Sequence, residues 1–253
     1  MTALPLRRIA DATPGRLISI DSESAIYRDG SYLKNNPSWH IEESPFKVRQ
    51  IQRMIKRQTL APKTVCDVGC GAGLVLAELQ PYLSSGCICW GYDVSPDALA
   101  MSEGRANDNL RFRMRDIRKD ECDTYFDLLL MLDVFEHVED YMGLVRAVRP
   151  KAKQKLFHIP LDLSVQAVLR KNGLLLRRDH HAHLHYFTRE TALRTLTDVG
   201  YTIVDYFYTP RCIELGDLFI QKVARIPRQL SFALAPDLTV RVLGGYSLMV
   251  LAE

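Results

Sequence analysis

Several features that mark other classes of protein are missing from this sequence of 253 residues. Its 33 lysines and arginines face 30 aspartates and glutamates, so it lacks the basic excess expected of a nucleic-acid-binding protein. Its six cysteines show no CxxC spacing, which argues against a structural zinc site and favours a reducing compartment. Apolar runs such as residues 128–132 are far too short to cross a membrane.

The sequence also shows no secretory signal, no internal repeat and no low-complexity segment. Arg7, Arg8 and Asp11 interrupt any apolar core near the first residue, so we expect a cytoplasmic protein. Apolar residues make up 47% and charged residues 25%, which is typical of a folded globular domain and excludes wholesale disorder.

From residue 63 onward, short apolar runs alternate with helical patterns. Such alternation favours a parallel sheet with helices on both faces. We therefore predict an α/β fold with a Rossmann-like doubly wound sheet, mostly parallel, with an antiparallel last strand. The expected strands are 64–68, 87–93, 110–115, 127–132, 155–159, 202–208 and 247–251, and the expected helices are 74–83, 96–106, 138–148, 163–170 and 189–199.

Two segments stand outside this alternation. Residues 1–44 are rich in turn formers and predict an N-terminal arm or lid, after which Ser44 is expected to cap a helix that begins at Pro45. The remaining domain, 45–253, contains an insertion at 211–246. Apolar residues recur there at helical spacing: Leu215, Leu218, Phe219, Val223 and Ile226. This pattern favours a helix that covers the core or forms a dimer contact, with a substrate lid or a membrane-surface element as alternatives.

The most informative segment is a glycine-rich turn between the expected strand 64–68 and the helix that follows it. Gly69 and Gly71 lack a Cβ and let the backbone approach a ligand, while the helix N-terminus offers free N–H groups. The dinucleotide fingerprint G-x-G-x-x-G/A is not matched, because Leu74 occupies its sixth position. The sequence also lacks a Tyr-x-x-x-Lys catalytic pair. Both observations disfavour an NAD-dependent oxidoreductase, which we keep as an alternative.

The spacing of Asp67, Gly69, Gly71 and Gly73 resembles motif I of the class I S-adenosylmethionine-dependent methyltransferases. The next strand ends at Asp93, 20 residues past the last glycine, where a carboxylate can accept both ribose hydroxyls of an adenosine. The fourth strand is followed by Glu136-His137-Val138, which resembles the EHV signature of the ubiquinone-biosynthesis-like small-molecule methyltransferases.

This resemblance implies that the chain is a methyltransferase whose cofactor is S-adenosylmethionine. Carried over residue by residue, it assigns the adenine contacts to Asp116 and Ile117 after the third strand. The full set of cofactor-binding residues that we predict is Asp67, Gly69, Cys70, Gly71, Gly73, Asp93, Val94, Asp116, Ile117, Leu132 and Asp133. A non-catalytic subunit that only binds the cofactor is a further alternative.

The acceptor is expected to be a small molecule, such as a sugar, a lipid precursor or a quinone-like phenol. No D/N-P-P-Y/F sequence occurs here, which argues against nucleobase or glutamine amide nitrogens as acceptors. O-methylation is the preferred reaction, and N- or C-methylation stays open. We expect no nucleic-acid partner and no membrane span, and the oligomeric state is left open with a homodimer as one option.

A hydroxyl acceptor benefits from a histidine base, because the pKa of histidine lies near neutrality. His137 and His185 are the predicted bases, although both also suit purely structural roles. His183 and His185 lie in a His-rich turn, residues 179–188. His183 is assigned to the substrate site together with the arm residues Trp39 and His40, with a role as the base as its alternative. We expect no metal, because alternating histidines in a loop lack an evident set of carboxylate partners.

Overall fold

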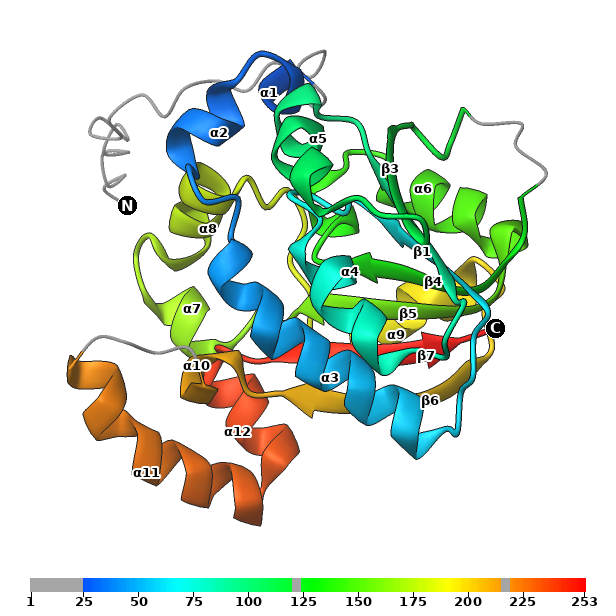
Figure 1. Ribbon diagram of the computed structural model, residues 1–253. Helices are drawn as coiled ribbons and strands as arrows, with labels where there is room; N and C mark the ends of the chain where they lie inside the picture. The colour runs from blue at the N-terminus through cyan, green and yellow to red at the C-terminus, as the bar shows by residue number, and fades with distance from the viewer. Residues whose placement is uncertain (1–24, 120–123, 215–218) are drawn as a thin grey trace, which may run out of the picture.

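The computed structural model describes residues 25–119, 124–214 and 219–253 (Figure 1). The strands in this part of the chain form one seven-stranded sheet in the order β3-β2-β1-β4-β5-β7-β6. Strand β7 pairs antiparallel with β5 and β6, whereas all other pairs in the sheet are parallel. This arrangement confirms the predicted fold class. The strands are β1 (Thr64–Val68), β2 (Ile88–Asp93), β3 (Leu110–Met114), β4 (Phe126–Leu132), β5 (Ala152–Pro160), β6 (Ile203–Thr209) and β7 (Ser247–Ala252).

Helices cover both faces of the sheet. Helices α3 and α4 pack on one face, while α6 and α9 pack on the other. The helices in the described residues are α1 (Ala25–Arg28), α2 (Ser31–Asn35), α3 (Ser44–Arg57), α4 (Leu74–Leu79), α5 (Pro96–Ser102), α6 (Tyr141–Val148), α7 (Val165–Leu169), α8 (Gly173–His181), α9 (Arg189–Asp198), α10 (Arg211–Glu214), α11 (Phe219–Leu234) and α12 (Pro236–Leu243).

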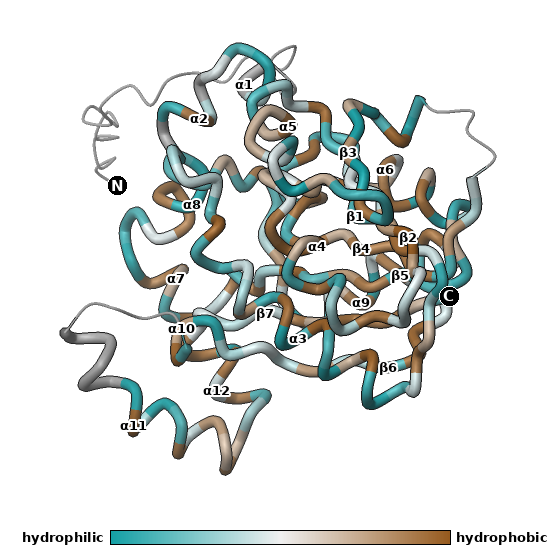
Figure 2. Tube along the Cα trace, in the orientation of Figure 1, coloured by the Kyte–Doolittle hydropathy of each residue, from teal (hydrophilic) through white to brown (hydrophobic). Residues whose placement is uncertain are grey.

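Strand β4 shows why the sheet is buried on both faces. Successive side chains of a strand point to opposite faces, so a strand between two helical layers must be apolar throughout. Leu128 and Leu130 belong to the core under α3 and α4, whereas Leu129 and Met131 belong to the core under α6 and α9. Figure 2 shows these strongly hydrophobic central strands between the helical layers.

Some helix boundaries differ from those expected, for local reasons. The 3-10 helix Ile41–Glu43 runs directly into α3, so Ser44 is the first helical residue and does not act as a side-chain cap. The helix expected at 138–148 begins only at Tyr141, because its cap is Asp140, whose carboxylate accepts a hydrogen bond from the Gly143 N–H. Helix α8 is not anticipated by the sequence analysis.

The arm and the insertion both contain helices. The short helices α1 and α2 belong to the expected arm, and α10, α11 and α12 belong to the expected insertion at 211–246. Residues 1–24 and the insertion's Leu215 and Leu218 lie outside the described residues. No helix in the described part of the chain is long and apolar enough to cross a membrane.

The sheet topology also indicates where a ligand binds. The chain runs from β1 outward to β3 on one side and from β4 to β5 on the other, so the strand order reverses between β1 and β4. In doubly wound sheets, ligands bind in the crevice at the carboxyl ends of the strands beside such a reversal. The glycine-rich turn follows β1 at this place.

Candidate active site

The glycine-rich turn has a backbone that only glycine adopts without strain. Gly69, Gly71 and Gly73 have φ angles of 74°, 53° and 76°. A Cβ on Gly71 would lie 2.7 Å from Cδ1 of Trp39, so the indole rests directly on the turn. The Gly69 N–H donates to the carbonyl of Tyr92 over 2.8 Å, which fixes the turn against β2.

A cavity of about 300 Å³ opens beside this turn, and we call it the nucleoside cavity. Asp93 lies at its edge, is 8% exposed, and accepts hydrogen bonds from the Gly71 N–H at 2.8 Å and the Ser95 N–H at 2.9 Å. Both carboxylate oxygens are therefore oriented by the backbone. The predicted cofactor residues that line this cavity are Gly69, Asp93, Val94, Asp116, Ile117 and Asp133.

A second cavity lies on the other side of Trp39, and we call it the polar cavity. Its lining includes Asp67, Gly69, Cys70, Gly71, Gly73, Leu132 and Asp133 from the predicted cofactor set, and Trp39, His40, His137 and His183 from the remaining predicted site residues. Tyr32, Trp39, Gly69, Asp133 and His137 line both cavities, so the two meet at these side chains.

Asp67 places in the polar cavity a carboxyl group with one oxygen that lacks a hydrogen-bond partner. Its side chain is 2% exposed, and Oδ1 has no hydrogen-bond partner. Burial raises the pKa of Asp67 to about 7, although the nearby Lys47 opposes this shift. A cationic group that entered the cavity would satisfy this carboxylate.

The arm covers the junction of the two cavities with aromatic side chains. The ring of Tyr32 lies 4.7 Å from that of Tyr27 and 4.8 Å from that of Trp39. Trp39 and His40 both have left-handed backbone conformations, with φ of 49° and 56°, which direct their rings toward the glycine-rich turn and the polar cavity. The arm thus contributes aromatic side chains to the walls of both cavities.

Asp133 is the centre of a buried ionic network at the end of β4. Its Oδ2 accepts from Lys47 Nζ at 2.8 Å, and its Oδ1 lies 2.6 Å from Nδ1 of His158. His158 in turn contacts the Thr209 hydroxyl over 2.9 Å. Burial alone would raise the pKa of Asp133, but His158 and Lys47 hold it well below its usual range. The sequence analysis did not anticipate Lys47 or His158, because both come from elements distant along the chain.

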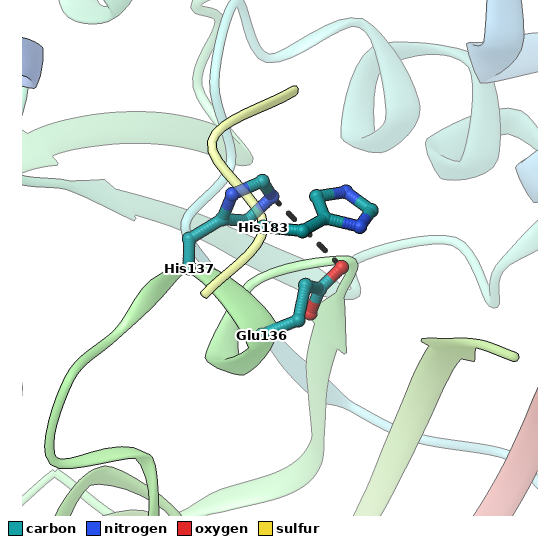
Figure 3. Close-up of side chains that lie close together, drawn as sticks. All are labelled: Glu136, His137 and His183. Carbon is teal, nitrogen blue, oxygen red and sulfur yellow. Dashed lines mark ion pairs between the residues drawn. The ribbon is translucent and has the colours of Figure 1, made fainter. Parts of the chain in front are cut away.

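Three titratable side chains meet where the EHV turn touches the His-rich turn (Figure 3). Glu136 is fully buried, neither carboxylate oxygen has a hydrogen-bond partner, and burial raises its pKa well above the usual range. His137 Nδ1 lies 3.2 Å from the Ala182 carbonyl, which can only accept, so Nδ1 carries the proton and Nε2 is an acceptor. Burial lowers the pKa of His137 to about 3, so this ring is neutral.

His183 has a different environment from His137. Its Nδ1 lies 2.6 Å from Oδ2 of Asp162, a residue of the loop after β5, so the carboxylate fixes the N–H on Nδ1. Arg177 Nε lies 3.3 Å from the other carboxylate oxygen. Burial alone would raise the pKa of Asp162. The hydrogen bond from His183 and the positive charge of Arg177 instead lower the pKa of this carboxyl. Nε2 of His183 is left as a proton acceptor.

His185 occupies neither cavity. Its Nε2 donates to the carbonyl of Val138 over 3.0 Å, and its ring lies 4.4 Å from that of Tyr141. These contacts favour the structural alternative for His185, in which it holds the His-rich turn, and its role as a base stays a prediction. His183, two residues earlier, is the histidine of the turn that reaches the polar cavity.

The reason for expecting no metal needs correction as well. The potential ligand atoms of Glu136, His137 and His183 lie within 4.8 Å of one another, and Asp162 adjoins His183. The fold thus supplies the carboxylates that the histidines lack along the sequence. Among the described residues this is the one such cluster of three or more side chains, and it suits proton transfer as well as metal binding.

Comparison with known proteins shows the family to which the chain belongs. A family model described as a methyltransferase domain matches residues 39–206. The chain belongs to this family. It is a class I S-adenosylmethionine-dependent methyltransferase, as its motifs predict, and S-adenosylmethionine is its cofactor. Neither an NAD-dependent oxidoreductase nor a non-catalytic subunit is supported.

The individual relatives share less than a third of their aligned residues with this chain. A ubiquinone biosynthesis O-methyltransferase of Coxiella burnetii is 29% identical over 132 residues, which cover 50% of this chain and 54% of that protein. The chain therefore spans about half the length of the curated relatives that it matches first.

Two solved structures share the fold. The N-methyltransferase NodS of Bradyrhizobium japonicum with S-adenosylhomocysteine has 17% identity, a TM-score of 0.56 and coverage of 88% and 98%. The plantazolicin methyltransferase BpumL has 16% identity, a TM-score of 0.60 and coverage of 91% and 93%.

Proposed function

We propose that the enzyme transfers the methyl group of S-adenosylmethionine to a hydroxyl group of a small molecule. The observation that carries this proposal is the pair formed by Asp162 and His183 in the polar cavity, with 2.6 Å between carboxylate and imidazole. A hydroxyl must lose its proton as it is methylated, and a histidine oriented by a carboxylate is suited to accept it. The O-methyltransferase among the relatives is consistent with this choice.

The residues of the crevice fit the cofactor. Asp93 would accept the ribose hydroxyls, and Asp116 with Ile117 would contact the adenine. The unpartnered Oδ1 of Asp67 would satisfy the ammonium of the methionine part, since a buried carboxylate requires such a partner. The other predicted cofactor residues, which we propose to shape the same crevice, are Gly69, Cys70, Gly71, Gly73, Val94, Leu132 and Asp133.

This assignment predicts a pH dependence of cofactor binding. Below the pKa of Asp67, about 7, its carboxyl is protonated and must lose that proton before it can pair with an ammonium. The affinity for S-adenosylhomocysteine should therefore fall roughly tenfold per pH unit below this pKa and level off above it. Calorimetric titrations from pH 5.5 to 8.5 measure this slope. Asp67→Asn should bind more weakly with a flat profile, and an unchanged slope in that variant would remove the assignment.

In the proposed reaction, the bound cofactor supplies an electrophilic methyl group on a positively charged sulfur. His183 accepts the proton of the acceptor hydroxyl at Nε2, and Asp162 stabilises the imidazolium that forms. His137, whose pKa is lowered to about 3 by burial, stays neutral and lines the same cavity as His183. The cavity walls would orient the acceptor toward the methyl group, and orientation of this kind supplies several kcal/mol of rate enhancement.

A screen with a methyl-labelled donor tests the proposal. Acceptors are offered as matched series of hydroxyl, amine and carbon-acid compounds of similar size, and incorporated label is counted after extraction. We expect incorporation into hydroxyl compounds, with His183→Ala as the negative control. Efficient labelling of amines or carbon acids with none of hydroxyl compounds would overturn O-methylation and leave the methyltransferase itself intact.

The arm is proposed to act as a lid over the bound cofactor. The indole of Trp39 touches Gly71, and aromatic faces attract a sulfonium cation. In a Trp90→Phe variant, Trp39 is the only tryptophan, and its fluorescence should change as the cofactor binds. Trp39→Ala should weaken S-adenosylmethionine binding by roughly tenfold, about 1.4 kcal/mol, with a smaller loss for S-adenosylhomocysteine, which lacks the sulfonium charge. Equal affinity of wild-type and Trp39→Ala for both compounds would contradict the lid.

We also propose that the enzyme works in the cytoplasm, with a small molecule as its substrate and no nucleic-acid partner. Within the described residues, Cys70, Cys87, Cys89 and Cys212 have free thiols, which suits a reducing compartment.

A further inference from the structure

Four helices at one end of the molecule leave large apolar side chains in solvent. Helix α7 packs against α8 and α12, and α12 packs against α11, so the four form one continuous group (Figure 1). Leu169 is 79% exposed, Leu175 56%, Ile226 67%, Leu230 61%, Leu234 87% and Leu238 62%. Scattered exposed leucines are ordinary, but several on helices that contact one another favour an interaction surface.

Helix α11 shows that the exposure follows from the orientation of the helix. Ile226, Leu230 and Leu234 are spaced by four residues and share one side of the helix. The opposite side faces the protein, because Phe232 stacks on Tyr246 at 5.0 Å and Arg228 Nη1 donates to the Gly244 carbonyl at 3.0 Å. The apolar stripe therefore points away from the core, the reverse of an ordinary surface helix.

The charge of the same helices indicates what covers this stripe. Residues 164–181 and 225–243 contain seven arginines and lysines and two aspartates. Three of the arginines are held within the protein, Arg177 by Asp162, Arg228 by the Gly244 carbonyl and Arg241 by Glu190. Arg170 and Lys171 are exposed between α7 and α8, and Arg225 is exposed beside Ile226. The core of a protein interface is depleted of charge, whereas apolar side chains interleaved with basic ones suit an anionic lipid surface.

We propose that α7, α8, α11 and α12 form a docking surface for an anionic lipid bilayer. The apolar side chains enter the headgroup region in the plane of the membrane, and the basic side chains pair with lipid phosphates. Helix α8 also contributes Arg177 and His181 to the polar cavity, so docking holds this cavity close to the lipid. The inference stands apart from the proposed O-methylation, because binding to vesicles needs no turnover.

Cosedimentation of the full chain with lipid vesicles tests this docking surface. Vesicles of phosphatidylcholine alone are compared with vesicles that also contain phosphatidylglycerol, at low and high salt. We expect binding to the anionic vesicles, weakened by salt, and little binding to phosphatidylcholine alone. Absence of binding to anionic vesicles at low salt would overturn the proposal.

Variants locate the binding on the proposed helices. Leu169→Glu and Leu230→Glu should each reduce vesicle affinity at least tenfold. Each removes an apolar side chain that the lipid would bury, and each adds a negative charge that the anionic lipid repels. Tyr82→Glu is the matched control, because Tyr82 is 68% exposed and lies outside the four helices. Thermal unfolding and S-adenosylhomocysteine binding verify that each variant is folded.

A second copy of the chain is the competing occupant of this surface. Analytical ultracentrifugation without lipid measures the oligomeric state of the wild type and of Leu230→Glu. A dimer that Leu230→Glu dissociates, together with no binding of the wild type to vesicles, would assign the surface to self-association. Vesicle binding that survives both leucine substitutions would equally contradict the proposal.

Discussion

Gly71→Ala is expected to weaken the binding of S-adenosylhomocysteine by roughly tenfold to a hundredfold. Two costs combine at this position. The left-handed backbone, with φ of 53°, costs any residue with a Cβ about 1–2 kcal/mol. In addition, the new Cβ would lie 2.7 Å from Cδ1 of Trp39, so the arm must move away from the turn. Calorimetry at a pH above the pKa of Asp67 isolates this effect from protonation.

The chain offers a matched control and a way to separate the two costs. Gly104→Ala introduces a Cβ with no atom within 4 Å and no positive φ, so it should leave affinity unchanged. In Gly71→Ala combined with Trp39→Ala, the steric cost disappears while the backbone cost stays, so the two substitutions should be less than additive. Wild-type affinity in Gly71→Ala would show that the turn does not hold the cofactor.

His183→Ala is expected to lower kcat by roughly 10²- to 10⁴-fold without changing the affinity for S-adenosylhomocysteine, because a general base acts only in the chemical step. Asp162→Asn should lower kcat as well, since the amide cannot stabilise the imidazolium. His180→Ala is the control, because His180 is exposed near the end of α8 and lines neither cavity. A kcat for His183→Ala within a few-fold of wild type, with turnover intact, would exclude His183 as the base.

The same residues could instead hold a metal, and a chelator distinguishes the two roles. Glu136, His137 and His183 lie close enough together to share an ion. With His183 as the base, dialysis against a chelator leaves turnover unchanged. Loss of turnover on chelation, restored by a divalent metal and absent in Glu136→Gln, would assign the cluster to metal binding and contradict the proposed base.

The sequence was informative wherever the site is built from contiguous residues. The glycine-rich turn, Asp93 and Asp116 follow individual strands, and parallel strands bring their carboxyl ends to the same edge of the sheet. Their convergence on one crevice therefore follows from the pattern. Partners from distant elements were not predictable in this way: Lys47 comes from α3 and His158 from β5, and only the folded sheet places both beside Asp133.

The choice between His183 and His185 depends on how one loop docks. The N–H groups of Leu184 and His185 donate to the Glu136 carbonyl at 2.8 and 3.1 Å, which fixes the turn against the EHV segment. This docking directs His183 toward Asp162 and His185 toward Val138. Residues two apart in a loop have no fixed relative orientation, so their spacing could not separate a base from a structural residue.

The insertion shows a similar limit of sequence patterns. Helical spacing of apolar residues at 211–246 correctly indicates helices, but spacing alone does not tell which side packs on the protein. In α11 the side that packs carries Arg228 and Phe232, and the side with Ile226 faces outward. Of the two favoured interpretations, the helix that covers the core therefore does not describe Ile226, whereas a dimer contact is compatible with its exposure.

The central claim is that a hydroxyl oxygen receives the methyl group, and one measurement addresses it most directly. The enzyme is incubated with donor carrying a carbon-13 methyl group and the best acceptor of the screen, and the product is examined by carbon–proton NMR. The account predicts a labelled methyl resonance at the position typical of a methyl ether, absent when His183→Ala replaces the wild type. A labelled methyl group bonded to nitrogen or carbon would contradict it.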